Sequence, residues 1–217
     1  MSTPCILLIG FEPFGGEPIN PSHEIVRCLS GESIDGHVIV ASTLPVEFAT
    51  VPGSLQELLD QHDAVIVLGI GQAGGRPALS LERIAVNLAD ARIADNAGAQ
   101  PCDVPLVVGA PAAYFSTLPV KAMVAAMHAA GVPATLSLSA GTFVCNQCFY
   151  ELSHRLEKCG SAARSGFLHV PWLPEQAVSH PGAACLSIET MLTGVRAALA
   201  CAIATDRDIA MVGGEIH

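Results

Sequence analysis

A cysteine in the second half of the chain stands where its thiol could act as a nucleophile. The stretch from Ser139 to Tyr150 contains small and turn-forming residues that deliver Cys145 onto the predicted start of a helix. The first N–H groups of a helix are unpaired and carry partial positive charge, so they favour a thiolate beside them and should lower the pKa of the Cys145 thiol. Free cysteines are also common in protein cores. Cys145 is therefore a candidate nucleophile only if residues elsewhere in the sequence can act together with it.

Two further residues supply the groups that a cysteine hydrolase requires. Glu82 lies on the apolar face of a predicted strand, where a carboxylate needs a cationic or hydrogen-bonding partner, with Arg83 or water as the simplest one. His169 lies near the end of the short apolar strand 167–171, and open α/β sheets bind ligands beyond the carboxyl ends of their strands. Imidazole can take the thiol proton and return it to the leaving group, while a carboxylate fixes the imidazole tautomer. The spacing alone does not prove this triad, which is recognised by geometry.

The elements that must position these residues alternate along the chain between strands and helices. Apolar runs such as 5–9 and 64–68 end in glycine, as strands buried on both faces do. We predict strands at 5–9, 37–44, 64–68, 78–88, 106–108, 134–138 and 167–171, and helices after Asn20-Pro21-Ser22 and at 48–61, 117–130, 146–158 and 187–205. The alternation predicts an α/β fold with three layers, α/β/α, around a mostly parallel, open, twisted sheet. No repeat or linker divides it, so we expect one domain over residues 1–217.

The composition excludes several classes of protein. The 217 residues carry 10 Lys and Arg against 20 Asp and Glu, and a net charge of −10 disfavours nucleic acid and anionic membranes as partners. Hydrophobic residues make up 51%, yet no segment reaches the roughly 20 apolar residues of a spanning helix. With no secretory signal at the N-terminus, we expect a cytoplasmic protein whose eight cysteines are mostly thiols.

Other interpretations of the motifs compete with a hydrolase. The glycines at 69–75 follow a strand, but Arg76-Pro77 comes next instead of the helix that a dinucleotide loop must open. Cys145 and Cys148 form a C-x-x-C pair at a helix start, which would suit a thiol-disulfide redox module but leaves Glu82 and His169 unexplained. A zinc site would need a second such pair, which the sequence lacks. A non-catalytic binding protein with an aromatic pocket but no hydrolytic activity is a further alternative.

Several long motifs, in order over nearly the whole chain, give it a resemblance to a known family. They are Gly10-Phe11-Glu12-Pro13-Phe14-Gly15-Gly16 with Asn20-Pro21-Ser22, Gly71-Gln72-Ala73-Gly74-Gly75-Arg76, Glu82-Arg83, Asp90-Ala91-Arg92-Ile93 with Asp95-Asn96, Ser139-Ala140-Gly141-Thr142-Phe143-Val144-Cys145-Asn146, and His169-Val170-Pro171 with Pro174-Glu175-Gln176. The sequence resembles the pyroglutamyl-peptidase I family, also called pyrrolidone-carboxylate peptidases. These are cysteine peptidases that remove an N-terminal pyroglutamate from peptides.

The resemblance implies a role for each catalytic candidate. It implies Cys145 as nucleophile, His169 as general base and acid, and Glu82 as the carboxylate that orients the imidazole. Arg92 and the backbone N–H of Cys145 would receive the oxyanion. The family uses no metal or organic cofactor, and it implies a homotetramer.

The resemblance also implies a pocket for the five-membered lactam. Phe11, Phe14 and Phe143 would enclose the flat ring, and Asn20 and Gln72 would satisfy its amide. A neutral lactam offers little charge to bind, so apolar walls and a few directed hydrogen bonds must supply recognition. An uncyclised glutamate would bring two charges into this apolar site and be excluded by their desolvation cost.

Overall fold

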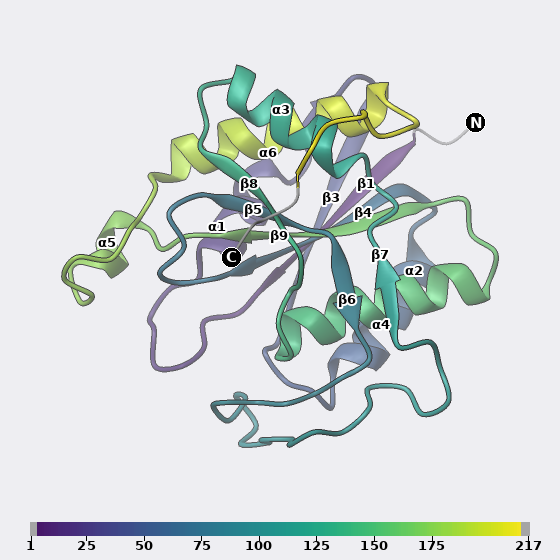
Figure 1. The fold of residues 1–217 in the computed structure, drawn as a ribbon, viewed down its shortest axis with the longest axis vertical. Coiled ribbons are helices and arrows are strands. Elements are labelled where there is room, and N and C mark those ends of the chain that lie inside the picture. Colours follow the sequence, from purple (N-terminus) through teal and green to yellow (C-terminus); the bar gives the residue numbers. More distant parts are fainter. Residues whose placement is uncertain (1–3, 214–217) are drawn as a thin grey trace.

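The centre of the protein is a seven-stranded sheet, seen in a computed structural model that describes residues 4–213 (Figure 1). In spatial order the strands are β2 (Ser33–Ile34), β3 (His37–Leu44), β1 (Cys5–Phe11), β4 (Ala64–Gln72), β9 (Arg164–Val170), β5 (Leu79–Glu82) and β8 (Ala134–Ser137). The four strands β3, β1, β4 and β9 are parallel to one another, while β5 is antiparallel to β9 and parallel to β8. The predicted mostly parallel, open sheet is confirmed.

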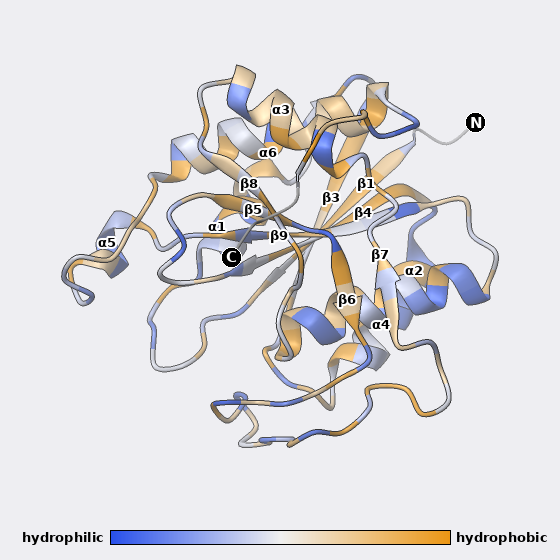
Figure 2. Ribbon diagram, in the orientation of Figure 1, coloured by the Kyte–Doolittle hydropathy of each residue, from blue (hydrophilic) through white to orange (hydrophobic). Residues whose placement is uncertain are grey.

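Helices cover both faces of this sheet, as the three-layer prediction requires (Figure 1). One face packs against α1 (Pro21–Leu29), α3 (Val120–Ala129) and α6 (Ile188–Ala204), and the other against α2 (Val51–Gln61) and α4 (Val144–Lys158); the short α5 (Pro174–Ala177) follows β9. In β1, Ile6 and Leu8 enter the first core while Leu7 and Ile9 enter the second. Because both faces are buried, the central strands β1 and β4 are largely apolar, and Figure 2 shows them mainly in orange, between helices that carry both hydrophobic and hydrophilic segments.

A small second sheet corrects the prediction of one strand over 78–88. The chain pairs with β9 and β8 only as far as Glu82, and after Arg83 it continues as β6 (Ile84–Val86), which pairs with β7 (Ala113–Phe115). The prediction of a strand at 106–108 is wrong. There the amide of Asn87 donates to the carbonyl of Val107 and accepts from its N–H, so the backbone forms a turn.

The remaining predicted elements are present with shifted ends. Helix α2 begins at Val51 instead of 48, and α3 begins at Val120 instead of 117. Helix α4 begins at Val144, two residues earlier than predicted, which places Cys145 inside its first turn. Strand β9 begins at Arg164 rather than 167. None of the described helices is long and apolar enough to cross a membrane.

Candidate active site

The start of α4 holds Cys145 in a fixed position. A turn at Gly141, whose φ of +80° suits glycine, leads to Phe143 as the N-cap, and Cys145 is the second residue of the helix. The next residue, Asn146, is buried. Its amide oxygen accepts from the N–H of Val86 at 2.9 Å, and its amide nitrogen donates to the carbonyls of Val86 and Leu88. Asn146 therefore ties the helix start to β6 and the residues after it.

The sulfur of Cys145 lies against the end of β4. A Cβ atom added to Gly71 would come within 2.6 Å of Cys145 Sγ, so only glycine leaves room for the thiol there. The neighbouring glycines serve packing as well: Gly69 leaves room for the ring of Phe167 and Gly74 for that of Trp172. These contacts account for the glycine-rich segment without a nucleotide.

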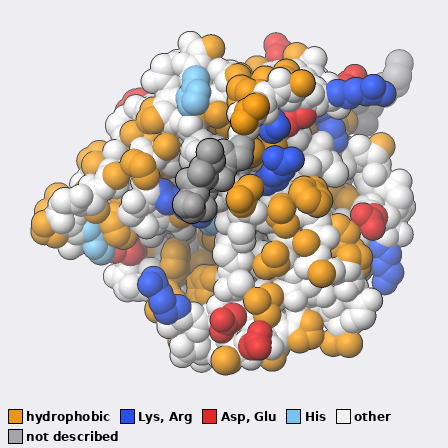
Figure 3. Space-filling model, viewed as in Figure 1, with side chains coloured by type: hydrophobic (Ala, Val, Ile, Leu, Met, Phe, Trp, Pro, Cys, Tyr) orange, Lys and Arg blue, Asp and Glu red, His pale blue; other side chains and the backbone are white. Residues whose placement is uncertain are grey.

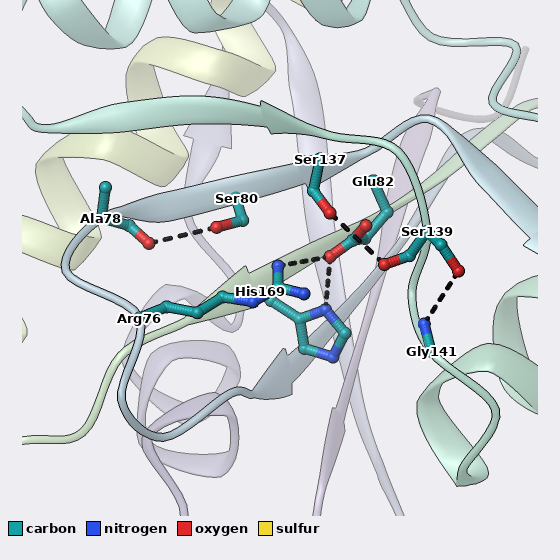
Figure 4. A network of polar contacts seen from close by, with 8 residues as sticks. All are labelled: Arg76, Ala78, Ser80, Glu82, Ser137, Ser139, Gly141 and His169. Atoms are coloured by element: carbon teal, nitrogen blue, oxygen red, sulfur yellow. Dashed lines mark hydrogen bonds and ion pairs between the residues drawn. The ribbon is translucent and has the colours of Figure 1, made fainter. Parts of the chain in front are cut away.

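His169 and Glu82 form a buried hydrogen-bonded pair (Figure 4). Nδ1 of His169 lies 2.7 Å from Oε1 of Glu82, and both side chains are almost fully buried. In the sheet, His169 is in register with Gly71 on one side and with Ser80 on the other. Because Gly71 contacts the sulfur of Cys145, the imidazole lies on the neighbouring strand at the level of the thiol. The structure thus brings Glu82, Cys145 and His169 together near the carboxyl ends of β4 and β9.

The cation that meets Glu82 is Arg76, which the sequence analysis did not assign to the site. Its Nη1 donates to Oε1 of Glu82 at 2.7 Å, so this oxygen receives both Arg76 and His169 (Figure 4). The predicted partner, Arg83, makes no ion pair with Glu82 among residues 4–213. It follows Glu82 in the chain, so its side chain leaves the backbone in another direction. In the sequence, Arg76 stands at the end of a glycine-rich loop that follows a buried strand. That position is the feature from which its place in the site could have been predicted.

The expectation of a lowered pKa for the Cys145 thiol is wrong for the unliganded protein. Loss of hydration raises the pKa of Cys145 to about 12, and the negative charge of Glu82 acts in the same direction. The positive charge of Arg76 and the backbone N–H of Cys145 lower it, but by less. The helix start therefore contributes as expected and burial outweighs it. A thiol of this kind needs a base to remove its proton, and His169 is the base at hand.

The predicted aromatic residues divide into two groups. Phe11 is 2% exposed and packs in the core, with its ring 6.1 Å from that of Phe167. Phe14 and Phe143 are half-buried, with ring centroids 6.1 Å apart, and Phe48 meets Phe143 edge-on at 5.4 Å. Phe14, Phe48 and Phe143 thus form an aromatic cluster beside the start of α4. Phe48 is a member that sequence reasoning missed.

The two predicted amide side chains lie in different settings. Asn20 is the N-cap of α1, where its oxygen accepts from Ser22 and its nitrogen donates to the carbonyl of Glu12, so both ends are already bonded. Gln72 ends β4, and its oxygen accepts from Gln176 at 2.9 Å. Among residues 4–213 the nitrogen of Gln72 has no acceptor, so that end of the amide can serve a ligand.

Arg92 is exposed on a loop that is attached to the start of α4. The N–H of Asp90 donates to the carbonyl of Thr142, and the hydroxyl of Thr142 donates back to the carbonyl of Asp90. Farther along, the buried carboxylate of Asp95 accepts from the N–H of Phe48 at 2.8 Å. These bonds hold the loop that carries Arg92 close to both Cys145 and the aromatic cluster.

The chain's similarity to known proteins agrees with this geometry. A model of the pyroglutamyl peptidase family matches residues 5–205. The chain belongs to the pyroglutamyl peptidase family. Curated family members include the pyrrolidone-carboxylate peptidase of Cupriavidus taiwanensis, 54% identical over 99% of this chain and 100% of that protein, and the enzyme of Yersinia pestis, 46% identical over 98% of this chain and 99% of that protein.

Solved structures of the pyroglutamyl peptidase family share the fold. The pyroglutamyl peptidase I of Bacillus amyloliquefaciens superposes with a TM-score of 0.94 at 38% identity, over 97% of this chain and 100% of that one. A mutant pyrrolidone carboxyl peptidase of Pyrococcus furiosus gives a TM-score of 0.89 at 41% identity, over 92% of this chain and 98% of that one. The resemblance found in the sequence motifs is confirmed.

A large cavity in the described part of the molecule is remote from this site. It has a volume of about 730 Å³ and lies where β4 begins, between α2 and the second half of α4, with Asp63, Ala64 and Arg155 in its lining. None of the predicted site residues lines it. The site at the other end of β4 is identified by its chemistry rather than by its size.

Proposed function

We propose that this protein is a cysteine peptidase that hydrolyses the bond after an N-terminal pyroglutamyl residue of peptides. The observation that carries the proposal is the His169–Glu82 hydrogen bond of 2.7 Å on the strand beside Gly71, against which the sulfur of Cys145 rests. Membership of the pyroglutamyl peptidase family supplies the substrate class.

The mechanism begins with a proton transfer. Glu82 accepts from Nδ1 of His169, which leaves Nε2 as the base that takes the proton from Cys145 Sγ. The thiolate attacks the pyroglutamyl carbonyl, and the oxyanion is stabilised by the N–H of Cys145 and by Arg92. His169 then protonates the departing amine, leaving a thioester. Water, deprotonated by His169, attacks the thioester and releases pyroglutamate and the thiol.

Recognition of the lactam falls to the side chains around the start of α4. Phe14 and Phe143, with Phe48, offer apolar surface to the flat ring, and the free nitrogen of Gln72 suits a carbonyl oxygen. Phe11 and Asn20 contribute by supporting this wall and the loop from Glu12 to Glu17, because their side chains are already packed or bonded. No metal or organic cofactor enters these steps.

The deciding experiment is release of a fluorescent amine from a pyroglutamyl amide. Wild type should release it, and Cys145→Ala and His169→Ala should lose about 10⁴-fold or more in kcat/KM, with Glu82→Gln losing less. The matching glutamyl amide, with its open chain and two charges, should not be cleaved. Undiminished turnover by Cys145→Ala would show that Cys145 is not the nucleophile and would contradict the proposed function. Binding of the pyroglutamyl amide without hydrolysis by wild type would indicate a binding protein.

The redox alternative has no support. Cys148 is fully buried in the core beside Leu152 and Phe149, and burial raises the pKa of its thiol, whereas an oxidoreductase thiol must be reachable and readily ionised. The eight cysteines are free in the structure. Full peptidase activity in Cys148→Ala, with no disulfide reductase activity in wild type, is the expected result.

The assembly and its location are proposals that rest on the family resemblance. We propose a homotetramer that works in the cytoplasm. Apolar side chains gather on the face over β6 and β7 (Figure 3), including Phe115, which is 61% exposed. Such a surface is suited to burial between subunits. Light scattering of the purified protein should give a mass of four chains, and a monomer at micromolar concentration would contradict it.

A further inference from the structure

When the thiol is ionised, the site carries charge on four side chains, which are the three of the expected triad and Arg76. We propose that Arg76 is a positioning residue of the reaction, acting through Glu82 to balance the charges of the thiolate–imidazolium state. This inference rests on the proposed roles of Cys145 and His169. It goes beyond them by assigning the loop after β4 a part in ionising the thiol.

The first observation in favour of this role is the set of hydrogen bonds that the Glu82 carboxylate accepts. One carboxylate oxygen, Oε1, receives both Nη1 of Arg76 and Nδ1 of His169 at 2.7 Å (Figure 4), while Oε2 is buried without a partner in the described structure. The carboxylate is 0% exposed. Burying a carboxylate with one unpartnered oxygen is costly unless a cation compensates its charge, and Arg76 supplies that cation.

The second support is the balance of charges when the thiol ionises. Moving the proton from Cys145 to His169 creates a thiolate and an imidazolium next to the Glu82 carboxylate. With Arg76 present, the two positive and two negative charges cancel. Without it, the same state carries one uncompensated negative charge beside the fully buried carboxylate of Glu82, which is unfavourable.

The third observation is that, among residues 4–213, Arg76 is the only Arg or Lys side chain that pairs with Glu82. Facing Glu82 are His169 on β9, Cys145 on α4, and Arg76 from the loop after β4, while its register partners are the uncharged Ser137 and Phe167. The charged side chains that act on the Cys145 thiol are Glu82, which opposes its ionisation, and Arg76, which favours it. The Arg76 side chain remains 34% exposed, so its loop brings a solvated cation to the edge of a buried site.

The test measures thiolate formation directly, without a substrate. Iodoacetamide alkylates thiolates, and mass spectrometry of the Cys145 peptide gives the pH midpoint of its alkylation for each variant. Arg76→Gln should move this midpoint upward by about one pH unit or more, because a favourable charge is lost. Arg76→Lys, which keeps the positive charge, should keep the midpoint close to that of wild type. Arg83→Gln removes a neighbouring arginine that does not pair with Glu82 and should leave the midpoint unchanged.

A double variant separates charge balance from mere support of the loop. Glu82→Gln alone should move the alkylation midpoint downward, and Arg76→Gln combined with Glu82→Gln should return it toward wild type. If Arg76 only supported the loop, the midpoint would not move in Arg76→Gln, and that result would overturn the proposal. Should Arg76→Gln fail to fold, Arg76→Met takes its place, and an unmoved midpoint in that variant would overturn the proposal equally. A protein that alkylates as expected but does not cleave pyroglutamyl amides would reject the proposed function and keep this inference.

Discussion

The sulfur of Cys145 lies so close to the α-carbon of Gly71 that the two residues fit together only because Gly71 has no side chain. An added Cβ would be 2.6 Å from the sulfur and 3.0 Å from the ring of Phe167. The proposed nucleophile on α4 is thus positioned by the backbone of β4. Since His169 is the register neighbour of Gly71 on β9, this one contact sets the depth of the thiol relative to its proposed base.

Gly71→Ala should therefore damage catalysis more than stability. The methyl group must displace the thiol, and a displacement of about 1 Å can cost roughly 100-fold in rate. We expect a loss of about this size in kcat/KM for a pyroglutamyl amide, with a destabilisation of about 1–3 kcal/mol from overpacking. Steady-state kinetics and urea unfolding measure the two effects.

The matched control for this variant is Gly53→Ala. Gly53 lies in α2, and an added Cβ there would meet nothing within 4 Å. This change should leave activity unaltered and stabilise the protein by about 0.5–1 kcal/mol, because alanine favours the helix. Full activity in Gly71→Ala would show that the contact with Cys145 does not position the thiol.

Phe11 and Phe14 should respond differently to truncation, although they stand three residues apart. Phe11 is buried in the core, so Phe11→Ala should cost about 3–5 kcal/mol of unfolding free energy. Phe14 is half-buried in the aromatic cluster, so Phe14→Ala should raise KM roughly tenfold or more with little change in stability. Thermal unfolding gives the stability of each variant, and steady-state kinetics gives its KM. If the two variants changed stability and KM equally, Phe11 and Phe14 would not have the different roles assigned to them.

Asp95 should control the loop that carries Arg92. Its carboxylate accepts from the N–H groups of Phe48, Ala97 and Ala99 at 2.8, 3.0 and 2.7 Å. Asp95→Ala leaves these donors without an acceptor, so we expect a destabilisation of about 2 kcal/mol or more together with a raised KM. Asp95→Asn keeps one acceptor oxygen and should fall between alanine and wild type. An unchanged KM in Asp95→Ala would show that the loop does not shape the site.

The fold was predictable from the sequence where local pattern and burial agree. Continuous apolar runs identified β1, β4 and β9 because a strand covered by helices on both faces has no polar face. Alternation could not show that the segment 78–88 changes partners after Glu82, since period two is common to both sheets. The apolar run at 106–108 was wrongly predicted to be a strand because the hydrogen bonds that bend it come from Asn87, about 20 residues away.

The site was predictable in its residue types but not in its connections. Glu82, Cys145 and His169 each stood at a strand end or helix start, yet the sequence offered Arg83 as the nearest cation for Glu82. The partner is Arg76, because the loop after β4 turns back with the N–H of Arg76 on the carbonyl of Ala73. The pKa of Cys145 was misjudged for a similar reason. A helix start is visible in sequence, whereas the dehydration of the thiol depends on tertiary packing.

The buried thiol of Cys148 should make the protein less stable in alkaline solution. Burial, and to a smaller extent the negative charges of Cys145 and Glu151, raise the pKa of Cys148 above its ordinary value of 9.0. Below pH 9 the thiol keeps its proton in both the folded and the unfolded state. Above pH 9 the unfolded chain releases the proton and the folded protein retains it, so unfolding becomes more favourable by about 1.4 kcal/mol per pH unit.

Cys148→Ala should remove the part of this dependence that Cys148 causes, while Cys145, whose pKa burial also raises, still contributes. At pH 7 the variant should be less stable than wild type by about 1 kcal/mol or more, because a cavity replaces the sulfur. As pH rises from 8 to 10.5 the difference should shrink, since wild type loses stability faster. Urea unfolding at several pH values measures the two curves. Cys28→Ala, which removes an exposed thiol, should run parallel to wild type, and a parallel curve for Cys148→Ala would show that the buried thiol does not carry the effect.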